Sequence, residues 1–322
     1  MRVGFTKALL LALGLTLGLG GAAGAQDKPH IRMSSLTLPV LNPIIVNILK
    51  AKNFDEKNGF VMDVTQLPSI TALYAAFATG EVDTIIGGPT VIQKLRVEGA
   101  PVKIIGTGLK LSDLVIFTEE PAIKTFADLK GKQLAADMGS QQYQIVAMYG
   151  LSKNLKMRED VTMVDANFAL ARSQLAAKRV DAAMVIEPIA SLMLKENPNL
   201  RIVFGGADAW KEMTGRDGWE LVTGLREEAI KRWPGAPQAL IASLQDVENY
   251  IKTDPDGADK IAADTVKLPP GTLKAAVSAN RWQFEVKPAW GPERQAIWDM
   301  FDRAVKSGFQ QKLPDEAIIY SP

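Results

Sequence analysis

Few side chains in this chain could do covalent chemistry, since it has no cysteine and a single histidine, His30. Catalysis by a Cys–His or Ser–His system needs a histidine beside the nucleophile, and a zinc site needs several His or Cys ligands. Such sites are excluded, whereas chemistry by a carboxylate pair stays open because the chain has 36 acidic residues. We expect no catalytic residue, no metal and no cofactor.

Hydroxyl, amide and glycine residues gather instead where short apolar runs give way to helical patterns. Helix N-termini beyond the carboxyl ends of strands offer unpaired N–H groups and a partial positive charge, so they can hold a small anion. The same residues could also serve only as helix caps or tight turns. The candidate ligand contacts of this kind are Ser35, Thr37, Gly88, Thr90, Ser140, Gln141 and Gln142.

Two further candidates follow from their place along the chain. Glu187 precedes a proline at the end of an apolar run, where its carboxylate could accept a hydrogen bond from a ligand amine or hydroxyl, or could face solvent or a partner protein. Trp219 lies beside an expected chain crossing and could line a cleft or pack in the core.

The elements that must position these residues alternate between strand and helix. Strands are predicted at 31–35, 60–66, 84–86, 102–106 and 114–118, with helices at 40–50, 70–79 and from Pro89. The rhythm restarts after Pro121, with strands at 133–136, 161–164, 182–186 and 201–204 and helices at 141–151 and 168–178. Such alternation predicts doubly wound α/β sheets.

An internal repeat supports two lobes of related build. Residues 73–89 read LYAAFATGEVDTIIGGP and residues 171–188 read ARSQLAAKRVDAAMVIEP. Each is a helix, a Val-Asp turn, an apolar strand and a proline that opens a helix. Coincidence between two ordinary helix–strand units is the alternative.

Mainly helical patterns follow residue 226, and we expect these helices to pack on the first lobe. The chain would then cross between lobes near 115–120 and near 218–223, which makes a two-strand hinge with a cleft. The expected domains are a first lobe of residues 26–117 plus 220–322 and a second lobe of residues 118–219.

Residues 1–25 have the three parts of a secretory signal peptide. Arg2 and Lys7 precede an apolar run at 8–20, and Ala23-Gly24-Ala25 gives a cleavage site after Ala25. The alternative is an uncleaved anchor, but the run is shorter than the roughly 20 residues that span a bilayer. The expected location is the periplasm. With 37 basic and 36 acidic residues, the chain has no charge pattern for binding nucleic acid.

Several motifs resemble those of periplasmic substrate-binding proteins of ABC importers, of the nitrate/sulfonate/taurine type. They are Gly80-Glu81-Val82-Asp83 with Gly88-Pro89, Phe126-Ala127-Asp128-Leu129-Lys130-Gly131-Lys132, Gly139-Ser140, and Val180-Asp181-Ala182-Ala183 with Glu187-Pro188. The resemblance implies two lobes with a hinge, closure on one small ligand, and delivery to a membrane permease with a cytoplasmic ATPase. Enzymes that make a thiamine pyrimidine precursor share this fold, but they use a Cys-rich motif and a reactive histidine that this chain lacks.

The sequence therefore predicts a monomeric, non-enzymatic solute-binding protein that serves a permease in the inner membrane. A small organic anion, such as a sulfonate, taurine or a carboxylate, is the expected ligand. A neutral pyrimidine-like or aromatic ligand, a secreted carboxylate-dependent enzyme and a chemoreceptor adaptor are the alternatives.

Overall fold

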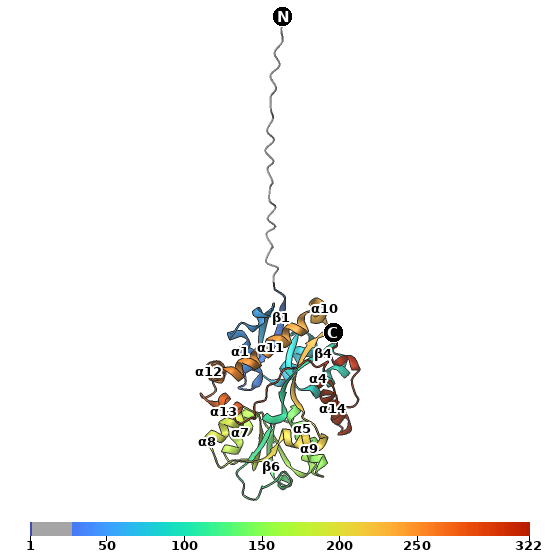
Figure 1. Ribbon diagram of the computed structural model, residues 1–322. Coiled ribbons are helices and arrows are strands. Elements are labelled where there is room, and N and C mark those ends of the chain that lie inside the picture. Colours follow the sequence, from blue (N-terminus) through green and yellow to red (C-terminus); the bar gives the residue numbers. More distant parts are fainter. Residues whose placement is uncertain (2–27) are drawn as a thin grey trace.

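The computed structural model describes Met1 and residues 28–322 and has two α/β lobes, one above the other (Figure 1). Each lobe has one five-stranded sheet flanked by helices, so the predicted two-lobed fold is confirmed. The expected signal peptide and its cleavage site lie outside the described residues. Within residues 28–322, none of the helices combines the length and the apolar character needed to cross a membrane.

The first lobe has a mixed sheet with the strand order β2-β1-β3-β10-β4. Strand β1 runs parallel to β2 and β3, whereas β10 runs antiparallel to β3 and β4. The strands are β1 (His30–Leu36), β2 (Val61–Leu67), β3 (Thr84–Gly87), β4 (Val102–Lys110) and β10 (Trp219–Arg226). The connecting helices are α1 (Leu41–Ala51), α2 (Phe54–Lys57), α3 (Ile70–Thr79) and α4 (Pro89–Val97).

The second lobe repeats this arrangement with the strand order β7-β6-β8-β5-β9. Its strands are β5 (Val115–Thr118), β6 (Gln133–Ala136), β7 (Thr162–Asp165), β8 (Ala182–Val185) and β9 (Arg201–Gly205). Its helices are α5 (Gln141–Ser152), α6 (Met157–Asp160), α7 (Phe168–Ala176), α8 (Ile189–Glu196) and α9 (Gly206–Thr214), with the 3-10 turn η2 (Phe126–Leu129). Helix α9 has no counterpart among the elements expected from the sequence.

The chain crosses between the lobes twice, at the 3-10 turn η1 (Leu111–Asp113) and between α9 and β10. The first crossing precedes β5, which pairs with β8 and β9 in the second sheet. The expected boundary after residue 117 therefore has to move ahead of β5. Apolar periodicity shows that residues 114–118 form a strand, but it does not show which sheet the strand joins.

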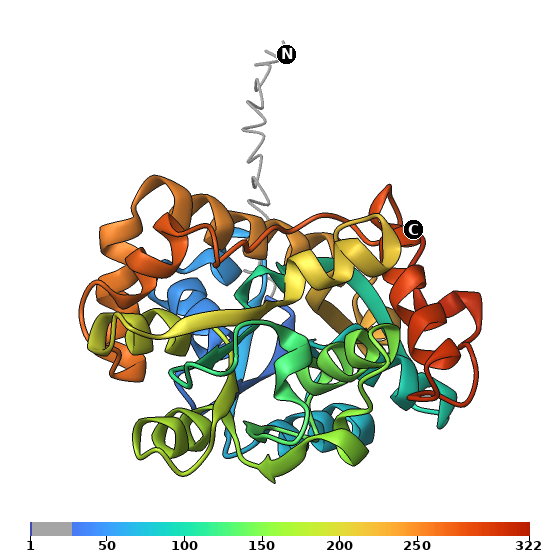
Figure 2. The ribbon, with the colours of Figure 1, turned by 90° about the horizontal axis from the view of Figure 1, so that it is seen from below.

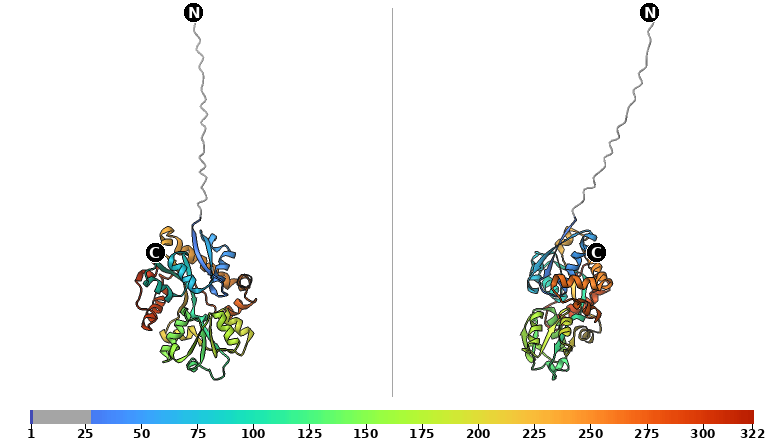
Figure 3. Two further views of the ribbon diagram at one scale, coloured as in Figure 1. Left: turned by 180° about the vertical axis from the view of Figure 1, so that it is seen from behind. Right: turned by 90° about the vertical axis from the view of Figure 1, so that its left-hand side faces the viewer.

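The C-terminal helices pack on the first lobe, as expected. Figure 2 shows these segments, orange to red, along one side of the molecule, and Figure 3 shows them beside the upper lobe. Buried residues of α1, α11, α12 and α13 form one apolar cluster with β1 and β4. The helices are α10 (Glu227–Arg232), α11 (Ala236–Thr253), α12 (Pro255–Val266), α13 (Thr272–Ser278) and α14 (Glu293–Lys306), followed by the turn η3 (Glu316–Ile318).

The internal repeat corresponds to the same substructure in both lobes, namely α3-β3-α4 and α7-β8-α8. Asp83 donates its N–H to the carbonyl of Arg32 at 2.8 Å, and its carboxylate accepts the Arg32 N–H at 3.0 Å. Asp181 makes the same two bonds with Gln133, at 3.0 and 2.7 Å. In each lobe the repeated aspartate thus joins the third strand along the sheet to its neighbour.

Candidate functional site

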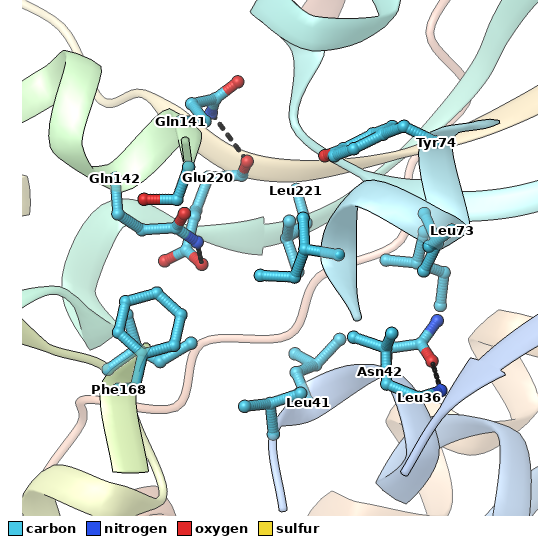
Figure 4. Close-up of a pocket in the computed structure, with 15 residues that line it drawn as sticks. Leu36, Leu41, Asn42, Leu73, Tyr74, Gln141, Gln142, Phe168, Glu220 and Leu221 are labelled. Carbon is cyan, nitrogen blue, oxygen red and sulfur yellow. Dashed lines mark hydrogen bonds between the residues drawn. The ribbon is translucent and has the colours of Figure 1, made fainter. Parts of the chain in front are cut away.

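A pocket lies between the lobes, lined by both of them (Figure 4). Centres of water-sized molecules can occupy about 50 Å³ of it, and one buried water needs roughly 10–15 Å³ on this measure. The space therefore suits a small molecule rather than a polymer. The lining residues are Leu36, Val40, Leu41, Asn42, Ile70, Leu73, Tyr74, Ile86, Ser140, Gln141, Gln142, Phe168, Ile186, Glu220 and Leu221.

Four helices begin at the wall of this pocket, two from each lobe. Helices α1 and α3 follow β1 and β2 in the first lobe, and α5 and α7 follow β6 and β7 in the second. The pocket thus lies beyond the carboxyl ends of four parallel strands, where open α/β sheets bind ligands. The first N–H groups of each helix have no partner within the helix itself, so the wall is electropositive at these ends.

Most of the pocket wall is apolar, and none of the lining residues is basic. Aliphatic side chains come from both lobes, and Phe168 supplies an aromatic ring from the first turn of α7. Glu220 is the only charged residue of the lining. A ligand that fills this space must therefore bring an apolar part.

Several polar groups of the lining are already used by the protein. Asn42 Oδ1 accepts the Leu36 N–H at 2.8 Å, and Ser140 Oγ caps α5 by accepting the Tyr143 N–H at 3.2 Å. The Tyr74 hydroxyl accepts the Gly88 N–H at 2.6 Å. Burial raises the pKa of Tyr74 to about 12, so this hydroxyl keeps its proton at neutral pH.

Gln141 ties the two lobes together with all of its amide atoms. Its Oε1 accepts the N–H and the hydroxyl of Thr90 at 2.9 and 3.0 Å. Its Nε2 donates to the carbonyls of Trp219 and Glu220 at 3.3 and 2.7 Å. The start of α5 is therefore fastened to the start of α4 and to β10, and this amide has no free atom for a ligand.

A pair of buried carboxyls, Asp113 and Glu220, joins the two chain crossings behind the pocket. Gln142 Nε2 donates to Glu220 Oε1. No donor within residues 28–322 reaches Glu220 Oε2 or either carboxyl oxygen of Asp113, so the two groups satisfy each other by sharing a proton. Burial raises the pKa of both carboxyls, and the charge of Glu220 raises that of Asp113 further, well above its usual range.

The structure brings three of the nine sequence-predicted contacts, Ser140, Gln141 and Gln142, into the pocket wall. Gly88 and Thr90 lie outside the lining and contact Gln141 instead. These residues hold the lobes together beside the pocket.

The other four predicted contacts lie outside the lining, each for a specific reason. Ser35 is buried in β1, and Thr37 is exposed beyond it. Glu187 is buried and ion-paired with Arg281. Trp219 is 2% exposed, and its ring N–H donates to Glu293 at 3.2 Å.

Sequence reasoning missed Asn42, Tyr74, Phe168 and Glu220. Phe168 carried a usable signal, because it opens a helix directly after a predicted strand, as Gln141 does. Asn42 is likewise in the first turn of a predicted helix. Glu220 had no local signal, since its role depends on Asp113 and Gln142 from distant parts of the chain.

Comparison with known proteins places the chain among periplasmic binding folds. A model of the family described as NMT1/THI5 like matches residues 42–258. No similar sequence is found among the curated proteins.

Solved structures of similar fold cover nearly the whole chain. The alkanesulfonate-binding protein SsuA from Xanthomonas axonopodis pv. citri matches with a TM-score of 0.73 and 20% identity, over 92% of this chain and 98% of that one. The periplasmic aliphatic sulphonate binding protein SsuA from Escherichia coli matches with a TM-score of 0.76 and 19% identity, over 92% and 93%. An ABC transporter protein from Parabacteroides distasonis gives 0.69 and 15%, over 92% and 99%. At these identities the likeness is one of fold.

Proposed function

Because this chain belongs to the NMT1/THI5-like family, we propose that it is the solute-binding component of an ABC importer. The observation that carries the proposal is the pocket between the lobes, to which each lobe contributes two helix N-termini. The protein captures a small molecule there and delivers it to a permease in the inner membrane. It acts in the periplasm as a monomer, after cleavage of the signal peptide behind Ala25.

The mechanism follows from how the two lobes meet. A ligand in the pocket touches both lobes, so it stabilises the state in which they are close together. The bonds from Thr90 to Gln141 and from Arg281 to Glu187 form in that same state. The closed surface is what the permease would recognise, and no covalent step is needed.

Two ligand classes compete for this pocket. The four helix N-termini favour a small organic anion, which is the class that the sequence predicts and the class to which the ligands of the sulfonate-binding neighbours belong. The apolar wall and the lack of a basic lining residue favour a neutral pyrimidine-like or aromatic ligand. The wall composition supports the second class better, because no side chain neutralises an anion.

A carboxylate-dependent enzyme is less well supported than a binding protein. Two carboxyls do meet, but Asp113 is fully buried and lies outside the pocket lining, so only Glu220 could reach a substrate. Glycosidase-type catalysis needs two carboxyls that flank the reacting bond, and a proton-sharing carboxyl pair must likewise face the substrate with both groups. A chemoreceptor adaptor would bind its ligand in the same way, and permease and ATPase genes beside this gene would argue for transport.

Thermal unfolding of the purified protein tests the proposal, after partial denaturation and refolding to remove carried-over ligand. The panel holds alkanesulfonates, taurine, nitrate, aromatic carboxylates, pyrimidines and arylalkylamines. A ligand at about 100 times its Kd adds about 2.7 kcal/mol to the free energy of unfolding. If no compound of the panel raises the unfolding temperature of a folded, ligand-free protein, the proposal is overturned.

A pair of leucine variants locates the binding site. Leu41→Ala removes part of the pocket wall, whereas Leu313→Ala changes a side chain that is 41% exposed. Ligand-induced stabilisation, measured against each variant's own ligand-free protein, should shrink for Leu41→Ala alone. Equal stabilisation of both variants would place the ligand elsewhere.

A further inference from the structure

We propose that Glu220 makes the pocket selective for ligands whose polar head donates hydrogen bonds, such as a primary amine or an amidine on an apolar body, and against anions. This inference rests on the proposed function, because it names the chemistry of the ligand in the same pocket. It replaces the small anion that the sequence predicts with a ligand whose head donates hydrogen bonds.

The position of Glu220 supplies the first argument. Glu220 is on β10, directly after the second crossing, with no exposed surface. Figure 4 shows its carboxylate on the side of the pocket formed by Gln142 and Phe168. One carboxylate oxygen accepts from Gln142, and the other meets no donor within residues 28–322. Apart from the proton that it shares with Asp113, the carboxylate at the polar end of the pocket thus meets one donor within residues 28–322, the amide of Gln142.

The surrounding charges supply the second argument. Asp113 shares one proton with Glu220, which leaves one negative charge for the pair. Glu187 is also near Asp113, and Arg281 is ion-paired with Glu187. No basic residue lines the pocket, so this buried negative charge has no counterion there. A cationic head would supply the missing charge and donors, whereas an anionic head would add a like charge in a site of low dielectric constant.

The helix N-termini supply the third argument. In a pocket without a carboxylate, the electropositive starts of α1, α3, α5 and α7 would attract an anion from solution. Here the protein places its own carboxylate in the same wall, hydrogen-bonded to Gln142 in the first turn of α5. Glu220 thus adds a fixed negative charge to the wall at which a sulfonate or carboxylate would otherwise bind.

Three probes with one apolar body and different heads test the inference: benzylamine, benzyl alcohol and phenylmethanesulfonate. Their Kd values are measured by titration calorimetry at pH 7 and one ionic strength. We expect benzylamine to bind about 10-fold or more tightly than benzyl alcohol, as for a hydrogen bond to a charged group. We expect the sulfonate to bind most weakly. Tighter binding of the sulfonate than of the amine would overturn the inference and leave the solute-binding function standing.

The variant Glu220→Gln keeps the shape of the side chain and removes its charge. It should bring benzylamine and benzyl alcohol to within about 3-fold of each other, while Glu316→Gln, at an exposed carboxylate, should keep the wild-type ratio. An unchanged ratio in a folded Glu220→Gln protein would overturn the role of Glu220. If that variant does not fold, the order of the three Kd values measured on the wild-type protein decides whether the inference holds. Failure of every probe and of the whole panel would overturn the solute-binding function as well.

Discussion

Asp83 in the first lobe and Asp181 in the second make the same pair of backbone hydrogen bonds, yet their surroundings differ. Asp83 is 1% exposed and also accepts from the guanidinium groups of Arg32 and Arg232, at 2.7 and 2.9 Å. Burial alone would raise the pKa of Asp83, but the hydrogen bonds from the two arginines outweigh it and hold the pKa below its usual range. Asp181 is only half-buried. The framework is repeated, whereas the charges around it are not.

The turns that follow the repeated strands differ in a similar way. In the first lobe the turn is Gly88, against which Gln141 of the second lobe packs. In the second lobe the turn is Glu187, which pairs with Arg281 of the first. Both turns are contact points between lobes, one by close approach and the other by an ion pair. The comparison teaches that equivalent positions can fasten the lobes by different physical means.

Removal of either repeated aspartate should reveal the largest difference in stability between the two copies of the repeat. Asp83→Ala leaves a backbone N–H and two half-exposed guanidinium groups without their acceptor, and should lower the free energy of unfolding by about 2.5 kcal/mol. Asp181→Ala should cost about 1.5 kcal/mol, as for one hydrogen bond to a carboxylate. Urea unfolding of both variants checks the difference. Equal losses would show that the arginines add nothing.

Removal of the ion pair between the lobes should have the next largest effect. Glu187→Ala leaves Arg281 without its carboxylate, at a cost of about 2 kcal/mol, since the Arg281 side chain is only 21% exposed. Small-angle scattering should also show a larger radius of gyration. The control is Glu187→Gln, which removes the charge of the side chain but keeps an amide oxygen that can accept a hydrogen bond from Ser191. The prediction fails if Glu187→Ala leaves both stability and size unchanged.

A methyl group at Gly88 should disturb the other contact point. Its carbon would lie 2.6 Å from Gln141 Oε1 and 2.9 Å from Gln141 Cβ, so Gln141 must move away from Thr90. We expect Gly88→Ala to cost roughly 1.5 kcal/mol and to weaken ligand binding. Gly139→Ala is the control, because the added methyl carbon would lie 3.6 Å from its nearest neighbour, Asp137 Oδ1. This variant should change neither the unfolding temperature nor ligand binding. Similar behaviour of the two variants would contradict a tight contact.

The carboxyl pair and Asp83 should respond to pH in opposite directions. A raised folded-state pKa means that the folded protein keeps a proton that the unfolded chain releases, so stability is lost as the pH rises from 3.8 through the folded-state pKa of Asp113. The slope is at most about 1.4 kcal/mol per pH unit for each proton. The lowered pKa of Asp83 instead costs stability as the pH falls below 3.8.

Asp113→Asn separates these two contributions. The variant should have a flatter pH profile on the alkaline side and an unchanged loss on the acid side, in urea unfolding across the pH range. Parallel profiles of variant and wild type would show that the pair does not share a proton.

The helix caps of the repeat should show the smallest effects and the closest match between lobes. Ser69 accepts the Ala72 N–H at 3.1 Å, and Asn167 accepts the Leu170 N–H at 2.9 Å. Alanine at either position should cost about 1 kcal/mol. Thermal unfolding of each variant measures this. A clear difference between them would mean that the repeat is less regular than its hydrogen bonds indicate.

Local patterns in the sequence predict the fold well, because alternating apolar runs and helix signals are local. The predicted helix at 70–79 has the bounds of α3, and Gly80 ends it with a φ of +84°. The Val-Asp turn and the proline of each copy predicted the repeat correctly. The start of α5 was predicted to face the pocket for a local reason too, since Ser140 caps the helix after a strand.

Long-range partners could not be predicted from one sequence. Nothing near Glu187 signals that Arg281 lies against it, and nothing near Trp219 signals Glu293. The charge of the pocket depends on Asp113 and Glu220, which come from the two separate crossings. The charge of the ligand therefore could not be derived from local patterns, whereas the location of a pocket beyond the strand ends follows from the alternation of strands and helices.

The position of β10 determines when each lobe can be completed as the chain leaves the ribosome or a translocation pore. Strand β10 lies between β3 and β4 in the first sheet, so that sheet lacks an inner strand until residues 219–226 have emerged. All five strands of the second lobe precede it in the chain. The lobe that is inserted in the sequence can therefore finish folding first, and the lobe that contains the N-terminal strand closes last.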